Sequence, residues 1–271
     1  MQSKALFEHT RQLPKVMEAA FSSFNELKID GVGVSEKPRN VDGSYMPVFL
    51  SGISCANAIA LSNNVNLYKT SHQVGHILSA LYGANRLDLI NEKFIAFHFS
   101  GGTTEALLVT PDDEQIIKCE KIAESSDLKA GQAIDRVGVM LGLNFPAGAK
   151  LDELSLNGTN PIKIKTSFKG LNCSLSGVEN KAKDLLEKGE KYENIARFTI
   201  EYIKETVLKM TQNLKVVYGD LPIVYSGGVM SNSIIKAELS KQGGIFCDAE
   251  FSSDNAVGIA VFASLKANKE V

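Results

Sequence analysis

Two segments in opposite halves of the chain repeat one pattern, an apolar strand followed by Ser-Gly-Gly. The first covers residues 97–102 and the second residues 224–228, so the two serines lie about 126 positions apart. Glycine has no Cβ atom, and its backbone amides can therefore approach a phosphate closely. A single turn of this kind occurs in many hairpins. Two of them favour two related halves that place their glycine turns opposite each other across a shared cleft.

Strand and helix patterns alternate along the chain. Strand-like apolar runs cover residues 29–34, 66–68, 94–99, 106–109, 115–120, 221–225 and 245–246. Helical patterns cover about residues 3–27, 54–61, 71–81, 128–141, 150–156, 175–187, 192–214, a segment from 232, and 253–266. Pro14 is expected to end or kink the first helix. The alternation predicts an α/β fold. We place an N-terminal lobe at residues 1–125 and a C-terminal lobe at residues 126–271, with the last helix returning toward the cleft.

Two of the four histidines lie four positions apart, in His72-Gln73-Val74-Gly75-His76. On a helix, positions i and i+4 share one face with Cβ atoms about 5–6 Å apart, and two imidazoles at this spacing can hold one metal ion. Zinc proteases use H-E-x-x-H, in which the glutamate is the general base. Gln73 stands in that position, and an amide takes no proton from water at neutral pH. The pattern allows a metal but lacks the base of a protease. Two solvated or core histidines are the alternative.

Further polar residues near the strand ends are candidates for the same site. Asp254 opens the last helix, where it either completes a metal site with the histidines or caps the helix. His98 lies on an otherwise apolar strand, a position more typical of a hydrogen-bonded core residue than of a ligand. The helix after the second turn begins near Asn232. Its first residues suit either a phosphate or ribose, or an ordinary cap by Ser231 or Asn232.

Asp135 and Gly148 are weaker candidates. Asp135 lies within a helical pattern, where an ion pair with lysine or arginine explains an acid equally well. Gly148 follows a turn at Pro146 and offers a backbone contact.

The composition excludes several classes of protein. The net charge is −2 and the pI is about 6.1, without the basic excess of a domain that binds nucleic acid by itself, so any RNA contact needs a local patch or a basic partner. The four cysteines are scattered and fit a reducing compartment. No apolar run approaches the ~20 residues of a membrane span, and the first residues lack the apolar core of an export signal. These features predict a cytoplasmic protein.

Six motifs follow one another along the chain: H-x-x-G-H (residues 72–76), S-G-G (100–102), G-x-x-x-D (131–135), P-x-G (146–148), S-G-G-V-x-x-N (226–232) and D-N-A (254–256). This order, over about residues 5–265, resembles the TsaD family, the threonylcarbamoyl transferases of tRNA modification, formerly called Gcp or O-sialoglycoprotein endopeptidases. The family fold resembles actin, sugar kinases and the heat-shock ATPases. The resemblance therefore implies two α/β lobes around a nucleotide cleft.

The resemblance also implies roles for individual residues. The family's metal-binding histidines match His72 and His76, and its metal-binding aspartate matches Asp254. His98 matches a tyrosine ligand of relatives and would be a third imidazole ligand. The nucleotide- and substrate-contacting positions match His98, Phe99, Ser100, Gly101, Gly102, Asp135, Gly148, Gly227, Gly228 and Asn232, among which Asp135 is the acid that contacts the ribose. The implied cofactors are one divalent metal, iron or zinc, and ATP or an adenylate.

The reaction implied by the resemblance moves a threonylcarbamoyl group from threonylcarbamoyl-AMP to N6 of adenosine 37 in tRNAs that read codons starting with A. The metal would polarise the carbamoyl carbonyl or hold the adenylate, and no residue forms a covalent intermediate. Because the net charge is −2, we expect tRNA to bind only with partner proteins. We further expect a homodimer or heterodimer and no contact with a membrane.

The chain also departs from the family pattern. It begins directly with a helix, whereas folds of this class begin with a strand hairpin that carries a phosphate-contacting turn, so we expect an N-terminally truncated version of the fold. Thr103 replaces the usual His or Asn, Ala123 replaces the Gly of G-E-T, and Glu179 stands where the F-S-G-L-K signature has Lys. These changes indicate a divergent paralogue. They keep two alternatives open, a non-catalytic nucleotide-binding scaffold or regulatory paralogue and a metallo-glycoprotease, which Gln73 disfavours.

Overall fold

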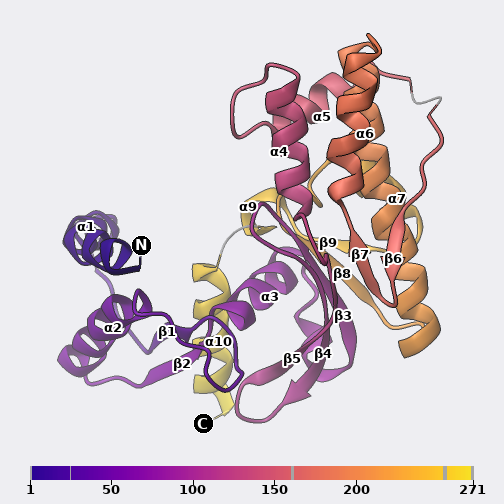
Figure 1. Cartoon of the computed structure of the whole chain (residues 1–271). Helices are drawn as coiled ribbons and strands as arrows, with labels where there is room; N and C mark the ends of the chain where they lie inside the picture. Colours follow the sequence, from indigo (N-terminus) through magenta and orange to yellow (C-terminus); the bar gives the residue numbers. More distant parts are fainter. Residues whose placement is uncertain (1, 25, 160–161, 253–254, 270–271) are drawn as a thin grey trace.

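The computed structural model describes residues 2–24, 26–159, 162–252 and 255–269 (Figure 1). At its centre is a five-stranded sheet in the order β5-β4-β3-β8-β9. β3 (Phe94–Phe99), β4 (Thr104–Asp112) and β5 (Ile116–Glu124) form an antiparallel meander. β8 (Ile223–Ser226) pairs in parallel with β3, and β9 (Ile245–Phe246) in parallel with β8. Five apolar runs of the sequence are thus strands of one sheet.

The two Ser-Gly-Gly turns leave this sheet side by side. β3 and β8 are parallel neighbours with His98 opposite Ser226, so both strands end at the same edge. The structure differs here from the expectation that the turns face each other across a cleft, because neighbouring parallel strands present their carboxyl ends together. The second turn requires glycine. Gly227 has a φ of +92°, and a Cβ atom there would overlap the Phe99 carbonyl oxygen.

Helices cover both faces of the sheet. One face carries α4 (Ala130–Met140), α5 (Gly148–Leu156), α6 (Ser176–Glu187), α7 (Tyr192–Tyr218) and α8 (Ser233–Lys241), with a hairpin of β6 (Ser167–Lys169) and β7 (Asn172–Ser174). The other face carries α3 (His72–Gly83) and α10 (Ala256–Lys269), with the short helices η1 (Leu87–Asn91) and α9 (Ala249–Ser252).

Alternate residues of β3 are buried on opposite faces of the sheet, as the period of two in a strand requires. Ile95, Phe97 and Phe99 belong to the core shared with α4, α6 and α7. Ala96 belongs to the core shared with α3 and α10. His98, two residues on, therefore points toward α3.

α3 and α10 cross so closely that glycine is needed at their contact. A Cβ atom on Gly258 would overlap the Gly75 carbonyl oxygen. Asn255 donates to the His72 carbonyl oxygen at 2.7 Å and accepts from Ser35 Oγ at 3.2 Å. The start of α10 is thereby held against the histidine helix. The division into lobes at residues 125 and 126 stays a prediction.

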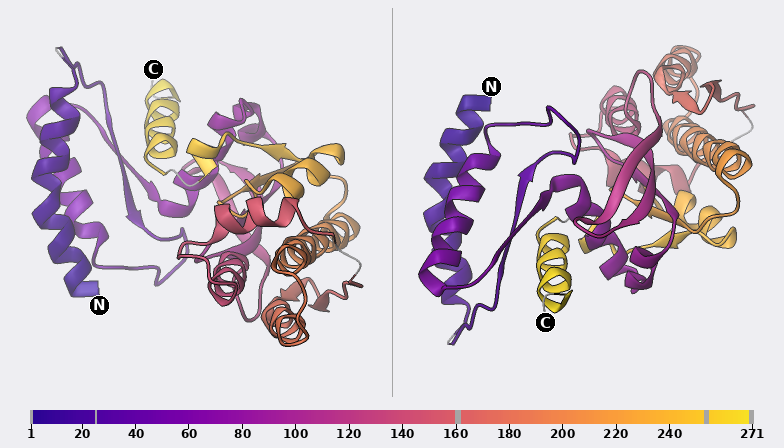
Figure 2. Two further views of the ribbon diagram at one scale, coloured as in Figure 1. Left: turned by 90° about the horizontal axis from the view of Figure 1, so that it is seen from above. Right: turned by 90° about the horizontal axis from the view of Figure 1, so that it is seen from below.

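The first part of the chain lies at one end of the molecule (Figure 2). β1 (Val32–Lys37) and β2 (Leu67–Ser71) form a two-stranded parallel sheet, on which α2 (Phe49–Asn63) packs. α1 (Gln2–Ser22) lies along α2, and Pro14 lies inside α1 without ending it. None of the helices in the described residues has the length and apolar character of a membrane span.

Candidate functional site

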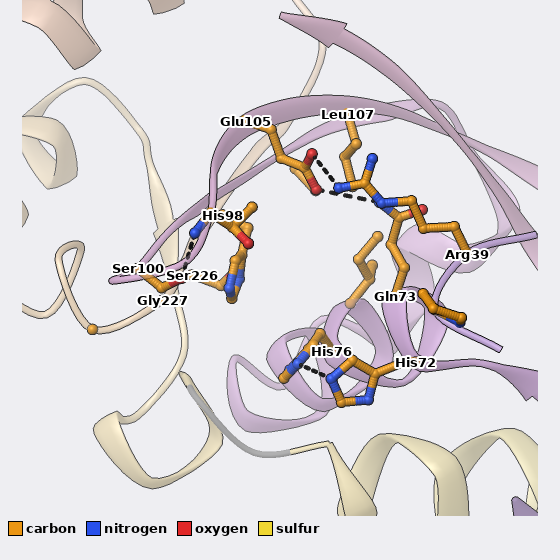
Figure 3. Close-up of a pocket in the computed structure, with 15 residues that line it drawn as sticks. Arg39, His72, Gln73, His76, His98, Ser100, Glu105, Leu107, Ser226 and Gly227 are labelled. Carbon is orange, nitrogen blue, oxygen red and sulfur yellow. Dashed lines mark hydrogen bonds and ion pairs between the residues drawn. The ribbon is translucent and has the colours of Figure 1, made fainter. Parts of the chain in front are cut away.

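Three histidines from two elements meet at a pocket of about 400 Å³ (Figure 3). His72 and His76 come from the first turns of α3, which the Ser71 side chain caps. His98 comes from β3, on the face that α3 covers. The wall also contains Arg39, Glu105 and residues 226–228 of the second turn. We call this space the imidazole pocket.

The two histidines of α3 touch each other. Nε2 of His72 and Nε2 of His76 lie 3.1 Å apart, and their ring centroids are 4.4 Å apart. The ring centroids of His76 and His98 are 5.3 Å apart. Neighbouring protein atoms partly exclude water from the ring and lower the pKa of His72, although a contact with the Asn255 side chain offsets part of the shift. The predicted helix and its shared face are confirmed.

His98 is held as a neutral imidazole. Its pKa is lowered to about 4, first because the ring is buried and then because His76 and His72 lie near it. The Ser226 hydroxyl donates to the Phe97 carbonyl oxygen at 3.0 Å, so its oxygen accepts from Nδ1 of His98 at 3.1 Å. This network assigns the free lone pair to Nε2. His98 is therefore both a hydrogen-bonded residue and a candidate ligand.

The spacing of His72 and His76 fits two ligands of one transition metal. Two nitrogens bound to one tetrahedral metal at about 2.0–2.1 Å lie about 3.3 Å apart, which is close to the 3.1 Å between the two Nε2 atoms. Neutral imidazoles suit iron and zinc. Within the described residues, no three His, Cys, Asp or Glu side chains lie close enough together to hold a metal ion. Asp254, the acid expected to complete the set, lies outside those residues.

A second pocket, of about 460 Å³, adjoins the first and shares Ser100 and Gly228 with it. The rest of its lining comes from the two turns and from the starts and first turns of nearby helices: Gly101, Gly131, Ile134, Asp135, Pro146, Gly148, Ala149, Asp152, Val229, Ser231 and Asn232. A Cβ atom on Gly131 would lie 2.6 Å from the Gly101 backbone nitrogen, so α4 begins directly against the first turn. We call this space the turn pocket.

Two polar residues of the turn pocket bond to backbone N–H groups. Asp135 Oδ1 accepts from the Ala147 N–H at 2.8 Å, and this contact replaces the ion pair considered from the sequence. The Asn232 side chain caps α8 by accepting from the N–H groups of Ile234 and Ile235 at 3.1 Å each. Both side chains are thus fixed at the edge of the pocket.

Phe99 and Gly102 line neither pocket. The Phe99 ring is fully buried in the core on the α7 face, and its backbone lies at the second turn, where the carbonyl oxygen accepts from the Val229 N–H at 3.1 Å. The Gly102 N–H donates to Ser100 Oγ at 3.3 Å. These two residues thus support the turns through backbone hydrogen bonds and do not line either pocket.

Two charged residues of the imidazole pocket, Arg39 and Glu105, were not among the residues that the sequence motifs indicated. Glu105 pairs with His98 in the β3–β4 register, so both side chains point to the same face of the sheet. Arg39 Nη2 donates to Glu105 Oε2 at 2.8 Å, and Gln73 Nε2 donates to Oε1 at 3.3 Å. An acid therefore does lie beside the histidine helix. The sequence did contain a signal for Glu105, because a hairpin that turns at residues 100–103 places it opposite His98. It contained none for Arg39, because the loop that carries Arg39 has no periodic pattern.

A family model described as TsaD, tRNA N6-adenosine threonylcarbamoyltransferase, matches residues 3–261. A tRNA N6-adenosine threonylcarbamoyltransferase of Thermosipho africanus is 31% identical to this chain, over 93% of the chain and 78% of that protein. The protein of the same name from Ligilactobacillus salivarius is 28% identical, over 95% of the chain and 77% of that protein.

Solved structures share the fold at low sequence identity. The crystal structure of T. kodakarensis HypF has a TM-score of 0.63 and 14% identity, over 80% of this chain and 40% of that one. A full-length HypF in the phosphate- and nucleotide-bound form has a TM-score of 0.57 and 14% identity, over 90% of this chain and 47% of that one. The expected α/β fold of the actin-like class is confirmed.

Proposed function

This chain belongs to the TsaD family of tRNA N6-adenosine threonylcarbamoyltransferases, and from that premise we propose that it transfers a threonylcarbamoyl group from threonylcarbamoyl-AMP to N6 of adenosine 37 in tRNA. In this reaction the N6 amino group bonds to the carbamoyl carbon and loses a proton, while AMP leaves with the bridging oxygen. The observation that carries the proposal is the pair of adjoining pockets, one lined by imidazoles and one by glycine turns and helix starts.

The turn pocket suits the adenylate. Helix starts carry a partial positive charge, which favours a phosphate. Gly101 and Gly228 let the backbone approach that phosphate, Asp135 accepts from the ribose hydroxyls, and Gly148 and Asn232 border the nucleoside. ATP would bind through the same contacts.

The imidazole pocket suits the carbamoyl group. Ser100 and Gly228 line both pockets, so a phosphate held there directs the group that it carries toward the histidines. His72 and His76 would hold the divalent iron or zinc, with His98 and Asp254 as further ligands. Such a metal supplies a Lewis acid for the carbamoyl carbonyl when bound. The residues of the chain position the reactants, and none forms a covalent intermediate.

Partner proteins would bring the tRNA to this site. With a net charge of −2, the chain lacks the basic excess that binding RNA alone requires. We therefore propose that the chain acts as part of a homodimer or heterodimer. The proposal places the protein in the cytoplasm. It also places the lobes at residues 1–125 and 126–271 on either side of the nucleotide.

A transfer assay tests the proposal. The chain is incubated with freshly made threonylcarbamoyl-AMP, iron or zinc, and an unmodified tRNA that reads codons starting with A, with and without the partner proteins of a TsaD relative. Mass spectrometry of the digested tRNA should detect N6-threonylcarbamoyladenosine only when the chain is present, and His72→Ala should abolish it. No product in any mixture, with wild type folded and loaded with metal, would contradict the proposal.

A nucleotide-binding scaffold is the second candidate. Glu179, which stands where the family signature has lysine, accepts from Arg136 Nη1 at 2.9 Å, so this position offers no cation to a substrate. A scaffold would form no product in this assay and would still bind AMP in a calorimetric titration. A metallo-glycoprotease gains no support from Glu105, because Arg39 and Gln73 already occupy this carboxylate. Metal-dependent cleavage of a sialylated glycoprotein by wild type but not His72→Ala would reverse that judgement.

A further inference from the structure

An ion pair of Arg39 and Glu105 faces the histidines across the imidazole pocket (Figure 3). Arg39 lies in the loop after β1, and Glu105 lies on β4 opposite His98. The Glu105 side chain is 7% exposed and the Arg39 side chain 37% exposed. The carboxylate is therefore deep in the wall, and the guanidinium lies at its surface.

The loop that carries Arg39 is fixed on both sides. The Pro38 carbonyl oxygen accepts from the Gln73 N–H at 3.0 Å, which ties the loop to α3. Asn40 Nδ2 donates to Gln115 Oε1 at 3.2 Å, which ties it to the turn between β4 and β5. Because its neighbours are held, Arg39 presents its guanidinium in a preorganised position, and little ordering is needed when a ligand binds.

Both members of the pair have hydrogen-bonding capacity beyond the bond between them. A guanidinium carries five N–H donors, and here the Nη2 group bonds to Glu105. A carboxylate offers about four acceptor positions, and Glu105 uses one on each oxygen, Oε2 for Arg39 and Oε1 for Gln73. Among the described residues that line this pocket, the charged side chains of the Lys, Arg, Asp and Glu types are those of Arg39 and Glu105.

We propose that Arg39 and Glu105 bind the amino-acid part of the transferred group, with Arg39 on its α-carboxylate and Glu105 on its N–H. This inference rests on the proposed function and names the residues that would separate an N-carbamoyl amino acid from a simpler carbamoyl group. A planar guanidinium matches the geometry of a carboxylate, and hydrogen bonds between ionised groups are the strong ones.

The pair fits an amino acid better than a phosphate. Arg39 and Glu105 together carry no net charge, and a phosphate brings no donor that offsets its repulsion from Glu105. An N-carbamoyl amino acid carries an acceptor, its carboxylate, and a donor, its N–H, on the same Cα atom, as the pair requires. Ser100 and Gly228, which border both pockets, remain available for the phosphate, whereas Arg39 lines the imidazole pocket but not the turn pocket.

Calorimetric titration of the chain with three ligands tests this inference. The ligands are AMP, a hydrolysis-resistant analogue of threonylcarbamoyl-AMP, and the same analogue with its carboxylate converted to a carboxamide. Wild type should bind the carboxylate about 10- to 100-fold more tightly than the carboxamide, since a hydrogen bond to a charged group contributes on this scale. Arg39→Gln keeps a donor for Glu105 but should lose this preference, with its affinity for AMP unchanged. Arg39→Lys keeps the charge and should retain part of the preference.

Arg86→Gln is the matched control. The Arg86 side chain is 36% exposed and pairs with Asp88 at 2.9 Å, outside the lining of both pockets, so the variant should behave as wild type. An undiminished preference in Arg39→Gln overturns the inference. Equal wild-type affinity for the two analogues also overturns it but leaves the proposed function standing if both bind more tightly than AMP. If neither analogue binds wild type more tightly than AMP, both the inference and the proposed function fail.

Discussion

The imidazole pocket and the turn pocket adjoin at one edge of the sheet, yet different parts of the chain make them. Side chains define the imidazole pocket, where three imidazoles, a guanidinium and a carboxylate converge. Backbone defines much of the turn pocket, and the carboxylates that line it are bonded to backbone N–H groups: Asp135 to that of Ala147, and Asp152 to that of Ser233. Substitutions should therefore change the chemistry of the first pocket and the shape of the second.

The largest effect should come from removing both imidazoles of α3. His72→Ala/His76→Ala should lower metal affinity by more than about 100-fold, which is the upper end of what losing an outer partner of a ligand costs. The fold should change little, because both side chains line a pocket. Mass spectrometry of metal content after reconstitution with iron or zinc measures the loss, and His9→Ala, on the exposed side of α1, is the control. Metal retained in the double variant, or absent from wild type, would count against the site.

Acid should weaken the fold through His98. Its pKa is about 4 in the folded chain, against about 6.5 in an unfolded chain. Below about pH 6.5 the unfolded chain binds the additional proton, so stability falls as the pH drops from about 6.5 to 4, by up to about 3 kcal/mol from this residue. Urea unfolding of wild type and His98→Asn across this range measures the contribution. Identical pH dependence in the two proteins would refute the assignment.

Gly131 and Gly148 both line the turn pocket, but only Gly131 lies so close to a neighbouring backbone that an added methyl group would overlap it. Gly131→Ala places a methyl group against the backbone of the first turn, and we expect a loss of about 1–3 kcal/mol in the free energy of unfolding. Gly148→Ala meets nothing nearer than Ile134 Cγ2 at 3.9 Å and should change stability by less than about 1 kcal/mol. Chemical denaturation compares the two variants. Equal stabilities would show that the contact between α4 and the first turn can accommodate a methyl group.

The smallest of these effects should come from the cap of α8. Asn232→Ala removes two hydrogen bonds to backbone N–H groups and should cost about 0.5–2 kcal/mol. Ser231→Ala, one residue earlier and exposed, should cost less. Unfolding curves test the difference, and amide exchange in α8 localises it. A larger loss in Ser231→Ala than in Asn232→Ala would contradict the assigned cap.

Local patterns located the parts of the site that depend on neighbours in sequence. The apolar run at residues 94–99 is β3 without change, and the helix expected over residues 71–81 is α3, His72–Gly83. β3 reads as a continuous apolar run because both of its faces are buried. The helical period of α3 is visible because its apolar side packs against the sheet. The hairpin of β6 and β7 was missed, since three residues per strand are too few for a pattern to appear.

Placements that depend on distant segments were not available from those patterns. Arg39 meets Glu105, 66 positions away, because the loop after β1 is bonded to β4 and to the turn that follows it. The two Ser-Gly-Gly turns lie side by side because β3 pairs with β8, a choice of strand order that neither segment encodes by itself. The motifs thus indicated which residues matter, while the tertiary pairing decided which of them meet.

The crossing of α3 and α10 bears on how the protein matures during synthesis. Asn255 bonds to the His72 carbonyl oxygen across 183 positions of the chain, and contacts of such separation form late in folding. A ribosome-bound chain that still lacks α10 therefore holds His72 and His76 without the element that braces their helix. We expect α3 to reach its final position only after α10 has been synthesised.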